Sequence, residues 1–311
     1  MALPQKPLKS YMPDFLDWLD IEKGLSSKTQ ENYSNFLKHF FDWLDRNNLG
    51  EITPKNITEK YVWKYRVHLS RQRSLKRSTQ NYYLIALRSL LGYLLEKDIT
   101  SLPPDKIRLA REKEEKQVRF LTRDQLRAFF EGPDTSTFRG LRDRAILETL
   151  FSTGLRIAEL VALNREQIKI PKVSSEELEI VVTGKGKRVR PVYFSPQSLH
   201  WLGLYLKKRS DTHPALFVTY RNYETKSGAD RIAPRTIQTS FKKYAALSGV
   251  PLDTTPHVLR HSFATDLLSQ GVDIRTIQEF LGHKNIAATQ IYAHLTSKQL
   301  RETHRKFHSQ I

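Results

Sequence analysis

The segment His257–His261 (HVLRH) brings two histidines and an arginine together within five residues. Thr255 is a suitable N-cap and Pro256 a suitable first helical residue, so the segment is expected to open a helix. His257 and Arg260 are three residues apart and would project from one face near the helix N-terminus. Cationic side chains beside unpaired backbone N–H groups favour a phosphate ligand. The pattern predicts an anion site, while chance proximity in a chain with 10 histidines is the alternative.

The same segment offers a second chemistry, because His257 and His261 are four residues apart and would share one side of a helix. Zinc metalloproteases use this spacing but require a glutamate directly after the first histidine, where this chain has Val258. The chain also has no cysteine, which excludes thiolate nucleophiles and cysteine-ligated zinc. We therefore predict a site without a metal ion.

A further arginine stands in an unusual place, within the stretch Thr153–Leu160 (TGLRIAEL). Arg156 follows a glycine closely and is surrounded by mostly apolar residues. A buried arginine costs free energy unless an anion pairs with it. Glu159, three residues on, can orient the guanidinium. The sequence leaves open whether Arg156 binds an external anion or forms an arginine–glutamate pair that only stabilises the fold.

Other candidate side chains lie at the edges of expected elements. Lys185 stands at the tip of a predicted turn, Thr183–Lys187 (TGKGK). Gly282 is expected to end a helix and to turn His283 away from the helix axis. Tyr292 follows nine residues later, and packing is the ordinary role of any one of the 13 tyrosines. Each of these residues is a weak signal when it is taken alone.

The first hundred residues are expected to fold as helices. Apolar residues recur at helical spacing from Met12 to Leu19, and again after Ser27, where Gln30 would complete a capping box. Two more helices are predicted, over 58–70 and from an N-cap at Ser78. Together these elements predict a small helical bundle.

The chain changes character over 98–118. Pro103 and Pro104 stop any helix, and the segment Arg111–Lys116 contains no apolar residue. These features predict a linker between a helical domain, 1–97, and a second domain, 119–311.

The second domain mixes helices with strands. Thr122 and Gln125 predict a capped helix, and the apolar stretch over 141–153 predicts a buried helix that ends at Gly154. Alternating polarity predicts a β-hairpin with strands at 178–182 and 189–194. Further helices are expected over 157–163, 195–208, 234–248, 256–269, 273–281, 287–292 and from 297. The predicted fold is mainly α with a small β-hairpin (α+β).

The charge of the chain narrows the function classes. Lys plus Arg total 51 against 33 Asp plus Glu, which gives a net charge of +18, and both predicted domains are basic. A folded chain with this charge calls for a polyanionic partner. No segment is long and apolar enough to span a membrane, and the first ten residues lack a signal-peptide core. We expect two basic domains that clamp DNA, and a cytoplasmic, nucleoid-associated location that suits the lack of cysteine.

Two groups of basic residues are candidate DNA contacts. The first lies between the third and fourth predicted helices and contains no acid, and the second lies on a basic helix predicted over Lys226–Lys243. The members are Lys64, Arg66, Arg71, Arg73, Lys76 and Arg77 in the first group, and Arg231, Arg235, Lys242 and Lys243 in the second.

The candidate side chains occur in the order and local setting of the tyrosine recombinase (phage integrase) family, which this chain resembles over nearly its whole length. The helical domain looks like the core-binding, SAM-like DNA-binding domain of that family, and 119–311 looks like its catalytic domain. The compact size and short linker are most similar to those of Xer-type recombinases. The matching positions are Arg156, Lys185, His257, Arg260, His283 and Tyr292.

The resemblance implies that the protein cleaves and rejoins DNA strands through a 3′-phosphotyrosyl intermediate, with no metal ion, ATP or other cofactor. Tyr292 would be the nucleophile, and His257 would accept its proton or hydrogen bond to it. Arg156 and Arg260 would hold the non-bridging oxygens of the scissile phosphate, because a guanidinium is a permanently charged, bidentate donor.

Two more roles follow from the same resemblance. Lys185 would protonate the leaving 5′ oxygen, and His283 would donate a hydrogen bond to the scissile phosphate. Glu159, from its spacing of three residues, would orient Arg156 without touching the DNA.

The resemblance also implies a double-stranded DNA partner with a specific inverted-repeat site. Four protomers would act on two duplexes, as a homotetramer or as a heterotetramer with a second recombinase. An apolar stripe after Tyr292 would dock on a neighbouring subunit or pack on its own domain. Its members are Leu295, Leu300, Phe307 and Ile311.

Several activities share this chemistry. Resolution of chromosome or plasmid dimers is the role expected of a Xer-like chain, and integration or excision of a mobile element is the alternative. A type IB topoisomerase would use the same residues, but the helical first domain favours a recombinase. A DNA-binding protein without turnover would need neither the Tyr292 nucleophile nor both arginines.

Overall fold

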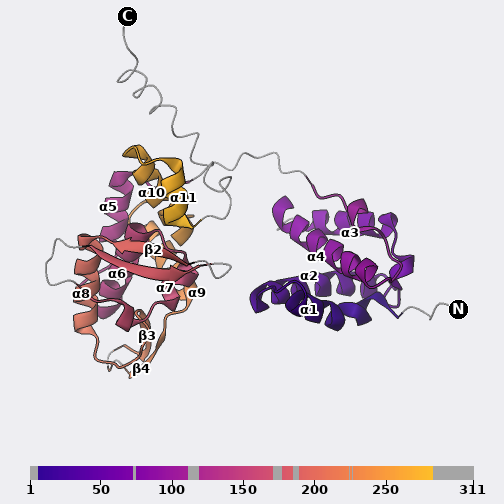
Figure 1. The fold of residues 1–311 in the computed structure, drawn as a ribbon, viewed down its shortest axis with the longest axis horizontal. Helices are drawn as coiled ribbons and strands as arrows, with labels where there is room; N and C mark the ends of the chain where they lie inside the picture. Colours follow the sequence, from indigo (N-terminus) through magenta and orange to yellow (C-terminus); the bar gives the residue numbers. More distant parts are fainter. Residues whose placement is uncertain are drawn as a thin grey trace, which may run out of the picture. The chain divides into compact units, whose positions relative to one another are not determined.

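A computed structural model of the protein describes residues 6–72, 75–110, 119–170, 177–184, 189–223, 225 and 227–282. The chain divides into two compact units, Met1–Glu115 and Lys116–Ile311, and each has its own hydrophobic core (Figure 1). Within the described ranges the structure is mainly helical with small antiparallel sheets, which confirms the predicted fold class. No helix in these ranges is long and apolar enough to cross a bilayer.

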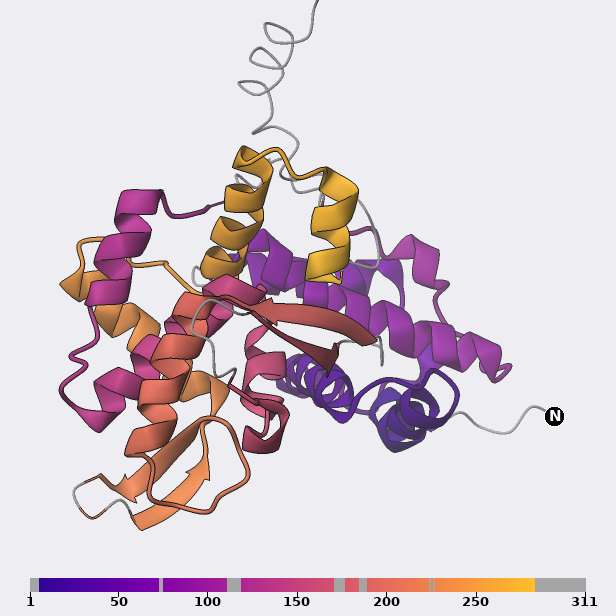
Figure 2. The same cartoon turned by 60° about the vertical axis from the view of Figure 1, so that its left-hand side comes forward.

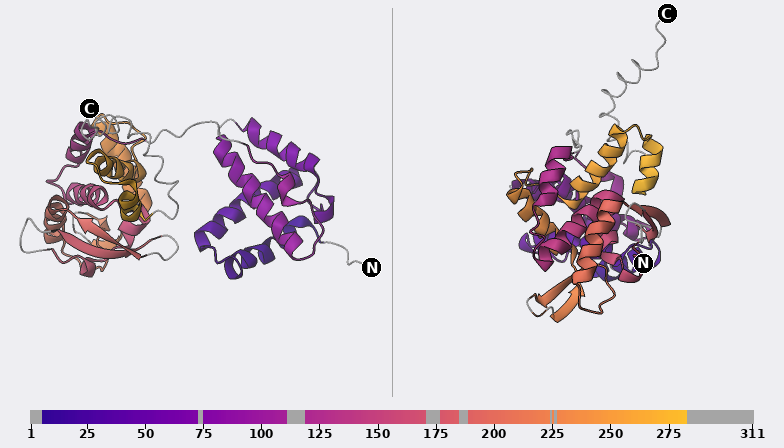
Figure 3. Two further views of the ribbon diagram at one scale, coloured as in Figure 1. Left: turned by 45° about the horizontal axis from the view of Figure 1, so that its top comes forward. Right: turned by 90° about the vertical axis from the view of Figure 1, so that its left-hand side faces the viewer.

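The first unit is built around α4, which packs against α1, α2 and α3 (Figure 3). Apolar side chains from all of these helices meet in one core, in which Phe15, Phe40, Tyr65 and Leu87 are fully buried. Burial of these faces, more than helix propensity, stabilises the helices. The elements are η1 (Leu8–Tyr11), α1 (Met12–Ile21), α2 (Ser27–Arg46), η2 (Pro54–Asn56), α3 (Glu59–Arg71), α4 (Arg77–Glu96) and η3 (Pro104–Lys106).

Two of the predicted helix starts in this unit are wrong. The N-cap of α2 is Ser26, one residue earlier than predicted. The Gln30 side chain donates to the carbonyl of Leu25 (2.8 Å), so it does not close a capping box. Helix α4 begins at Arg77, and Ser78 therefore lies inside its first turn. Gln30 therefore bonds to the turn before α2, and Ser78 belongs to the first turn of α4.

Residues 99–110, which the sequence assigns to the linker, pack as part of the first unit. Ile107 is 1% exposed and belongs to the core of this unit. The Asn81 side chain exchanges hydrogen bonds with the backbone of Ala110 in both directions, at 2.9 and 3.0 Å. Residues 111–118, the charged part of the predicted linker, lie outside the described residues.

The second unit is built around α6, which contacts α5, α8, α10 and β2 (Figure 2). Buried positions follow one another around α6, so the helix has no solvent-facing side in its middle turns. The predicted capping box of Thr122 and Gln125 is confirmed at the start of α5. The elements are α5 (Arg123–Glu131), α6 (Phe138–Thr153), α7 (Ile157–Ala162), η4 (Arg165–Gln167), β1 (Leu178–Thr183), β2 (Val189–Phe194), α8 (Pro196–Lys208), β3 (Val218–Asn222), β4 (Ser227–Arg231), α9 (Pro234–Leu247), α10 (Pro256–Ser269) and α11 (Ile274–Leu281).

The predicted hairpin is confirmed, because β1 and β2 pair antiparallel with Leu178 opposite Phe194. Alternate residues of each strand point into the core. Arg190 therefore shares the inward face of β2 with Val192 and Phe194. This places one charged residue on an otherwise apolar face.

A second hairpin, β3–β4, is absent from the sequence prediction. It lies at the opposite end of the unit from α10 and α11 (Figures 1 and 2). The prediction of one basic helix over 226–243 is wrong as a result, since Arg231 ends β4 and α9 begins only at Pro234. Proline suits the first turn of a helix, so Pro234 sets this boundary.

Candidate active site

Arg156 and Arg260 meet in the second unit, at the carboxyl end of α11. Arg156 is the N-cap residue of α7, and its Nη2 lies 3.5 Å from the carbonyl oxygen of Gly282. Arg260 lies on α10, and its Nη2 donates to the carbonyl of Leu281. The structure thus brings together two arginines that are 104 positions apart in the sequence.

The turn between α6 and α7 positions both arginines. Gly154 ends α6 with a left-handed φ of 59°, as the sequence predicts. A Cβ at this position would lie 2.7 Å from the ring of Phe263, so the close approach of α10 also requires glycine. The Gly154 carbonyl accepts a hydrogen bond from Nη1 of Arg260. Because a guanidinium is planar, its bonds to Gly154 and Leu281 fix the direction of its other N–H groups.

Glu159 is hydrogen-bonded to Arg156 and holds it in place. Its side chain is 6% exposed, and it accepts hydrogen bonds from the backbone N–H and from Nη1 of Arg156, both at 2.9 Å. Burial by itself would raise the pKa of this carboxyl, but the hydrogen bonds from Arg190 and Arg156 outweigh burial and hold the pKa at about 2. The carboxylate is therefore ionised throughout the neutral range.

Arg190 is the partner of Glu159 that sequence reasoning missed. Its Nη1 and Nη2 lie 3.1 and 2.8 Å from the two carboxylate oxygens of Glu159, and its Nε donates to the carbonyl of Phe280 at 3.1 Å. The available signal was the inward register of Arg190 with Val192 and Phe194, because a charged residue on a buried strand face needs a counter-ion.

His257 lies in the first turn of α10, where Thr255 accepts a hydrogen bond from the N–H of Val258 (3.3 Å). Burial lowers the pKa of His257, and the positive charges of Arg260 and Arg156 lower it further. His257 is therefore a neutral imidazole at neutral pH, and a neutral imidazole can accept a proton.

His261, one turn further along α10, has a pKa lowered to about 4. Burial is again the largest cause, followed by the charges of His257 and Arg260. Across the described part of the chain, no three histidine or carboxylate side chains are grouped as metal ligands.

The two arginines differ in how far solvent reaches them. The side chain of Arg156 is 26% exposed, whereas Arg260 is 4% exposed.

Several predicted residues cannot be placed, because they lie outside the described residues. These are Arg73, Lys185, His283 and Tyr292, the helices predicted over 287–292 and from 297, and the apolar stripe of Leu295, Leu300, Phe307 and Ile311.

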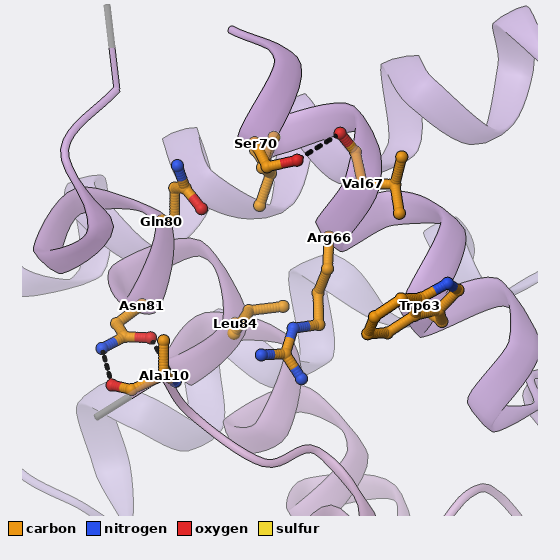
Figure 4. Close-up of a pocket in the computed structure, with 9 residues that line it drawn as sticks. Trp63, Arg66, Val67, Ser70, Gln80, Asn81, Leu84 and Ala110 are labelled. Carbon is orange, nitrogen blue, oxygen red and sulfur yellow. Dashed lines mark hydrogen bonds between the residues drawn. The ribbon is translucent and has the colours of Figure 1, made fainter. Parts of the chain in front are cut away.

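The first group of basic residues does not form one surface. Lys64 and Arg71 are seven residues apart on α3 and share one exposed side. Arg66 lies about 200° around the helix from Lys64. It lines a pocket of about 180 Å³ between α3 and α4, together with Trp63 (Figure 4). Two further members, Lys76 and Arg77, are exposed at the start of α4.

The second group also divides. Arg235 and Lys242 share an exposed side of α9, and Lys243 is exposed beside them. The guanidinium of Arg231, in contrast, donates to the carbonyls of Val161 (2.6 Å) and Leu163 (2.9 Å), and to the Asn164 side chain. Arg231 therefore joins β4 to the end of α7.

Comparison with known proteins places the chain in a family. Residues 13–98 match the phage integrase N-terminal SAM-like domain, and residues 119–299 match the phage integrase family. Tyrosine recombinase XerC from Pelotomaculum thermopropionicum is 36% identical over 96% of this chain and 97% of its own length. Tyrosine recombinase XerD from Lacticaseibacillus casei is 34% identical over 95% and 97%.

Solved structures share the fold. The XerH site-specific recombinase bound to palindromic difH substrate matches with a TM-score of 0.70 at 20% identity, over 97% of each chain. The XerA recombinase matches with a TM-score of 0.51 at 25% identity, over 98% of this chain and 100% of its own. The Xer tyrosine recombinase relatives match this chain over almost their entire length. With the two family models, these matches show that the chain is a member of the phage integrase family.

Proposed function

We propose that this protein is a site-specific DNA recombinase that cleaves and rejoins strands through a 3′-phosphotyrosyl intermediate. The observation that carries the proposal is the convergence of Arg156 and Arg260 at the end of α11. His257 lies near enough for both charges to lower its pKa, and Glu159 is ionised behind Arg156. Two permanent positive charges beside a neutral imidazole suit an anionic phosphodiester substrate and an attacking hydroxyl group that must lose its proton.

Cleavage proceeds by attack of the Tyr292 oxygen on the scissile phosphorus. A phosphorus–oxygen bond to tyrosine forms, and the bond to the 5′ oxygen breaks. Arg156 and Arg260 bind the non-bridging oxygens, on which negative charge grows in the transition state. His257 takes the phenolic proton, since a phenol with an ordinary pKa near 10 is a weak nucleophile at neutral pH.

Two further side chains complete the proposed step. Lys185 donates a proton to the leaving 5′ oxygen, and His283 donates a hydrogen bond to the phosphate. A 5′ hydroxyl from another duplex then attacks the phosphotyrosyl bond and releases Tyr292, so the energy of the broken linkage is kept. No net bond energy is lost in this exchange, and no cofactor is needed to restore it.

The proposed partner is double-stranded DNA with an inverted-repeat site, bound by both units. The first unit acts as the core-binding domain and the second as the catalytic domain. Exposed Lys64, Arg71, Arg235 and Lys242 are the proposed phosphate contacts. Four protomers act on two duplexes, as one chain or with a second recombinase, in the cytoplasm. Because the relatives above are Xer recombinases, we favour the resolution of chromosome or plasmid dimers as the role.

Covalent capture tests the proposal. Wild-type protein, Tyr292→Phe and the control Tyr193→Phe are incubated with nicked, fragmented host DNA, quenched in detergent, and the protein-linked DNA is sequenced. Tyr193 is a suitable control, because it is a partly exposed tyrosine (36%) of the same unit. Adducts are expected from wild type and from Tyr193→Phe, but not from Tyr292→Phe. The captured DNA sequences should converge on one inverted repeat. If wild-type protein binds DNA without adducts, alone and with a second recombinase of the same host, the catalytic proposal is wrong.

A further inference from the structure

We propose that Arg190 is a positioning residue for the cleavage step, and that it ties the Glu159–Arg156 pair to the carboxyl end of α11. The inference rests on the function proposed above. Arg190 lies on β2 and is 8% exposed. All three nitrogens of its guanidinium are engaged, two with Glu159 and one with the carbonyl of Phe280.

The carboxylate of Glu159 is shared evenly between two arginines. Its Oε1 accepts from Nη1 of Arg156 (2.9 Å) and Nη1 of Arg190 (3.1 Å). Its Oε2 accepts from the backbone N–H of Arg156 (2.9 Å) and Nη2 of Arg190 (2.8 Å). The two bonds from Arg190 fix the plane of the carboxylate, and that plane fixes where the Arg156 guanidinium points.

A second contact joins Arg190 to α11. Gly282 caps α11 with a left-handed φ of 60°, and a Cβ at this position would lie 2.9 Å from Cδ of Arg190. The backbone at 282 thus rests directly on the arginine stem. Arg156 approaches the Gly282 carbonyl from α7, so a shift of Arg190 would disturb Arg156 from two sides.

Another buried ion pair of the same unit provides a matched control. Arg144 and Glu148 are 13% and 7% exposed, with guanidinium nitrogens 3.0 and 2.7 Å from the carboxylate. Arg144 also donates to a backbone carbonyl, that of Phe130 (2.6 Å), as Arg190 does to Phe280. Its ring contacts are with Phe130 and Trp201, away from Arg156 and α11.

The test compares Arg190→Lys with Arg144→Lys in the full-length protein. Single-turnover cleavage of a nicked duplex is measured at saturating DNA, alongside Kd and Tm. Both variants are expected to lower Tm. Arg190→Lys should slow cleavage about 100-fold with Kd unchanged, since a misplacement of about 1 Å costs on that order. Arg144→Lys should cleave at the wild-type rate.

A double-mutant cycle identifies the route of the effect. In an Arg156→Lys background, Arg190→Lys should add little, because its effect passes through Arg156. The inference would be overturned if Arg190→Lys cleaved at the wild-type rate. It would also be overturned if the separate effects of Arg156→Lys and Arg190→Lys on the cleavage rate multiplied in full in the double variant. If the wild-type protein formed no covalent adducts with DNA, the proposed function would be overturned instead.

If Arg190→Lys does not fold, Gly282→Ala provides a second test of the same inference. The added Cβ displaces Arg190 without removing any of its donors. Gly249→Ala is its control, since Gly249 has a φ of 65° with nothing within 4 Å of a built Cβ. Gly282→Ala should slow cleavage at saturating DNA and Gly249→Ala should not. Equal cleavage rates for these two variants would overturn the inference.

Discussion

Replacement of Glu159 by glutamine removes a buried charge while keeping the shape of the side chain. The pKa of Glu159 falls from 4.5 to about 2 on folding, which corresponds to about 3 kcal/mol of folding free energy at about 1.4 kcal/mol for each pH unit. Removal of one member of a buried ion pair generally costs about 3–5 kcal/mol. Both routes give a loss of about 3 kcal/mol for Glu159→Gln at neutral pH.

Hydrogen exchange of the β1 and β2 amides in increasing urea, read by mass spectrometry, reports the stability of the second unit in the full-length chain. At pH 7 the variant should exchange these amides about 100-fold faster than wild type, as a loss of about 3 kcal/mol requires. The folded-state pKa lies below the unfolded value, so the contribution is complete above pH 4.5 and is lost as the pH falls towards 2. The advantage of the wild type should therefore shrink below about pH 5.

Glu148→Gln is the control for the sign of this effect. Burial raises the pKa of Glu148 despite its hydrogen bond from Arg144. A raised carboxyl pKa means that folding favours the protonated form. The free energy of unfolding of the wild type should therefore rise relative to that of Glu148→Gln as the pH falls below the raised pKa. Equal exchange in wild type and Glu159→Gln at pH 7, or a difference that persists undiminished at pH 3, would refute the reasoning.

Further variants probe a glycine, a histidine and the basic surface. Gly154→Ala should cost about 1–3 kcal/mol more than Gly249→Ala in thermal unfolding, because φ is positive at both positions but the added Cβ meets Phe263 only at the first. Burial and nearby guanidiniums lower the pKa of His257. The cleavage rate should therefore stay constant as the pH passes the ordinary histidine pKa of 6.5, and fall only in more acidic buffer. His257→Ala should abolish that decline in acid. Lys64→Ala should weaken binding to all DNA sequences alike and reduce the log–log salt slope by about 1 in a titration.

The sequence predicts those parts of the fold that depend on near neighbours. The end of α6 at Gly154 and the first strand pair follow from a glycine after an apolar stretch and from alternating polarity. The bond between Arg156 and Glu159 is equally local, since the two residues are three positions apart on one helical turn. Such features need no knowledge of the rest of the chain.

The sequence does not predict features that depend on distant partners. Strand β4 (SGADR) contains no β-branched or aromatic residue, and its pairing with β3 is fixed by the neighbouring strand and core. Arg231 likewise depends on carbonyls about 70 positions earlier. The bond from Arg190 to Glu159 joins a strand to a helix across 31 positions, so it appears only once the hairpin is folded against α7.

The last turn of α11 constrains how the length of this chain can vary. The carbonyls of Phe280–Gly282 accept from three guanidiniums, those of Arg190, Arg260 and Arg156 in turn. A helix rotates about 100° and rises about 1.5 Å with each residue. One residue inserted into α11 would carry all three acceptors away from donors that three other elements hold in place. Insertions in related chains should therefore occur in the turn between α10 and α11, while the eight-residue span of the helix stays constant.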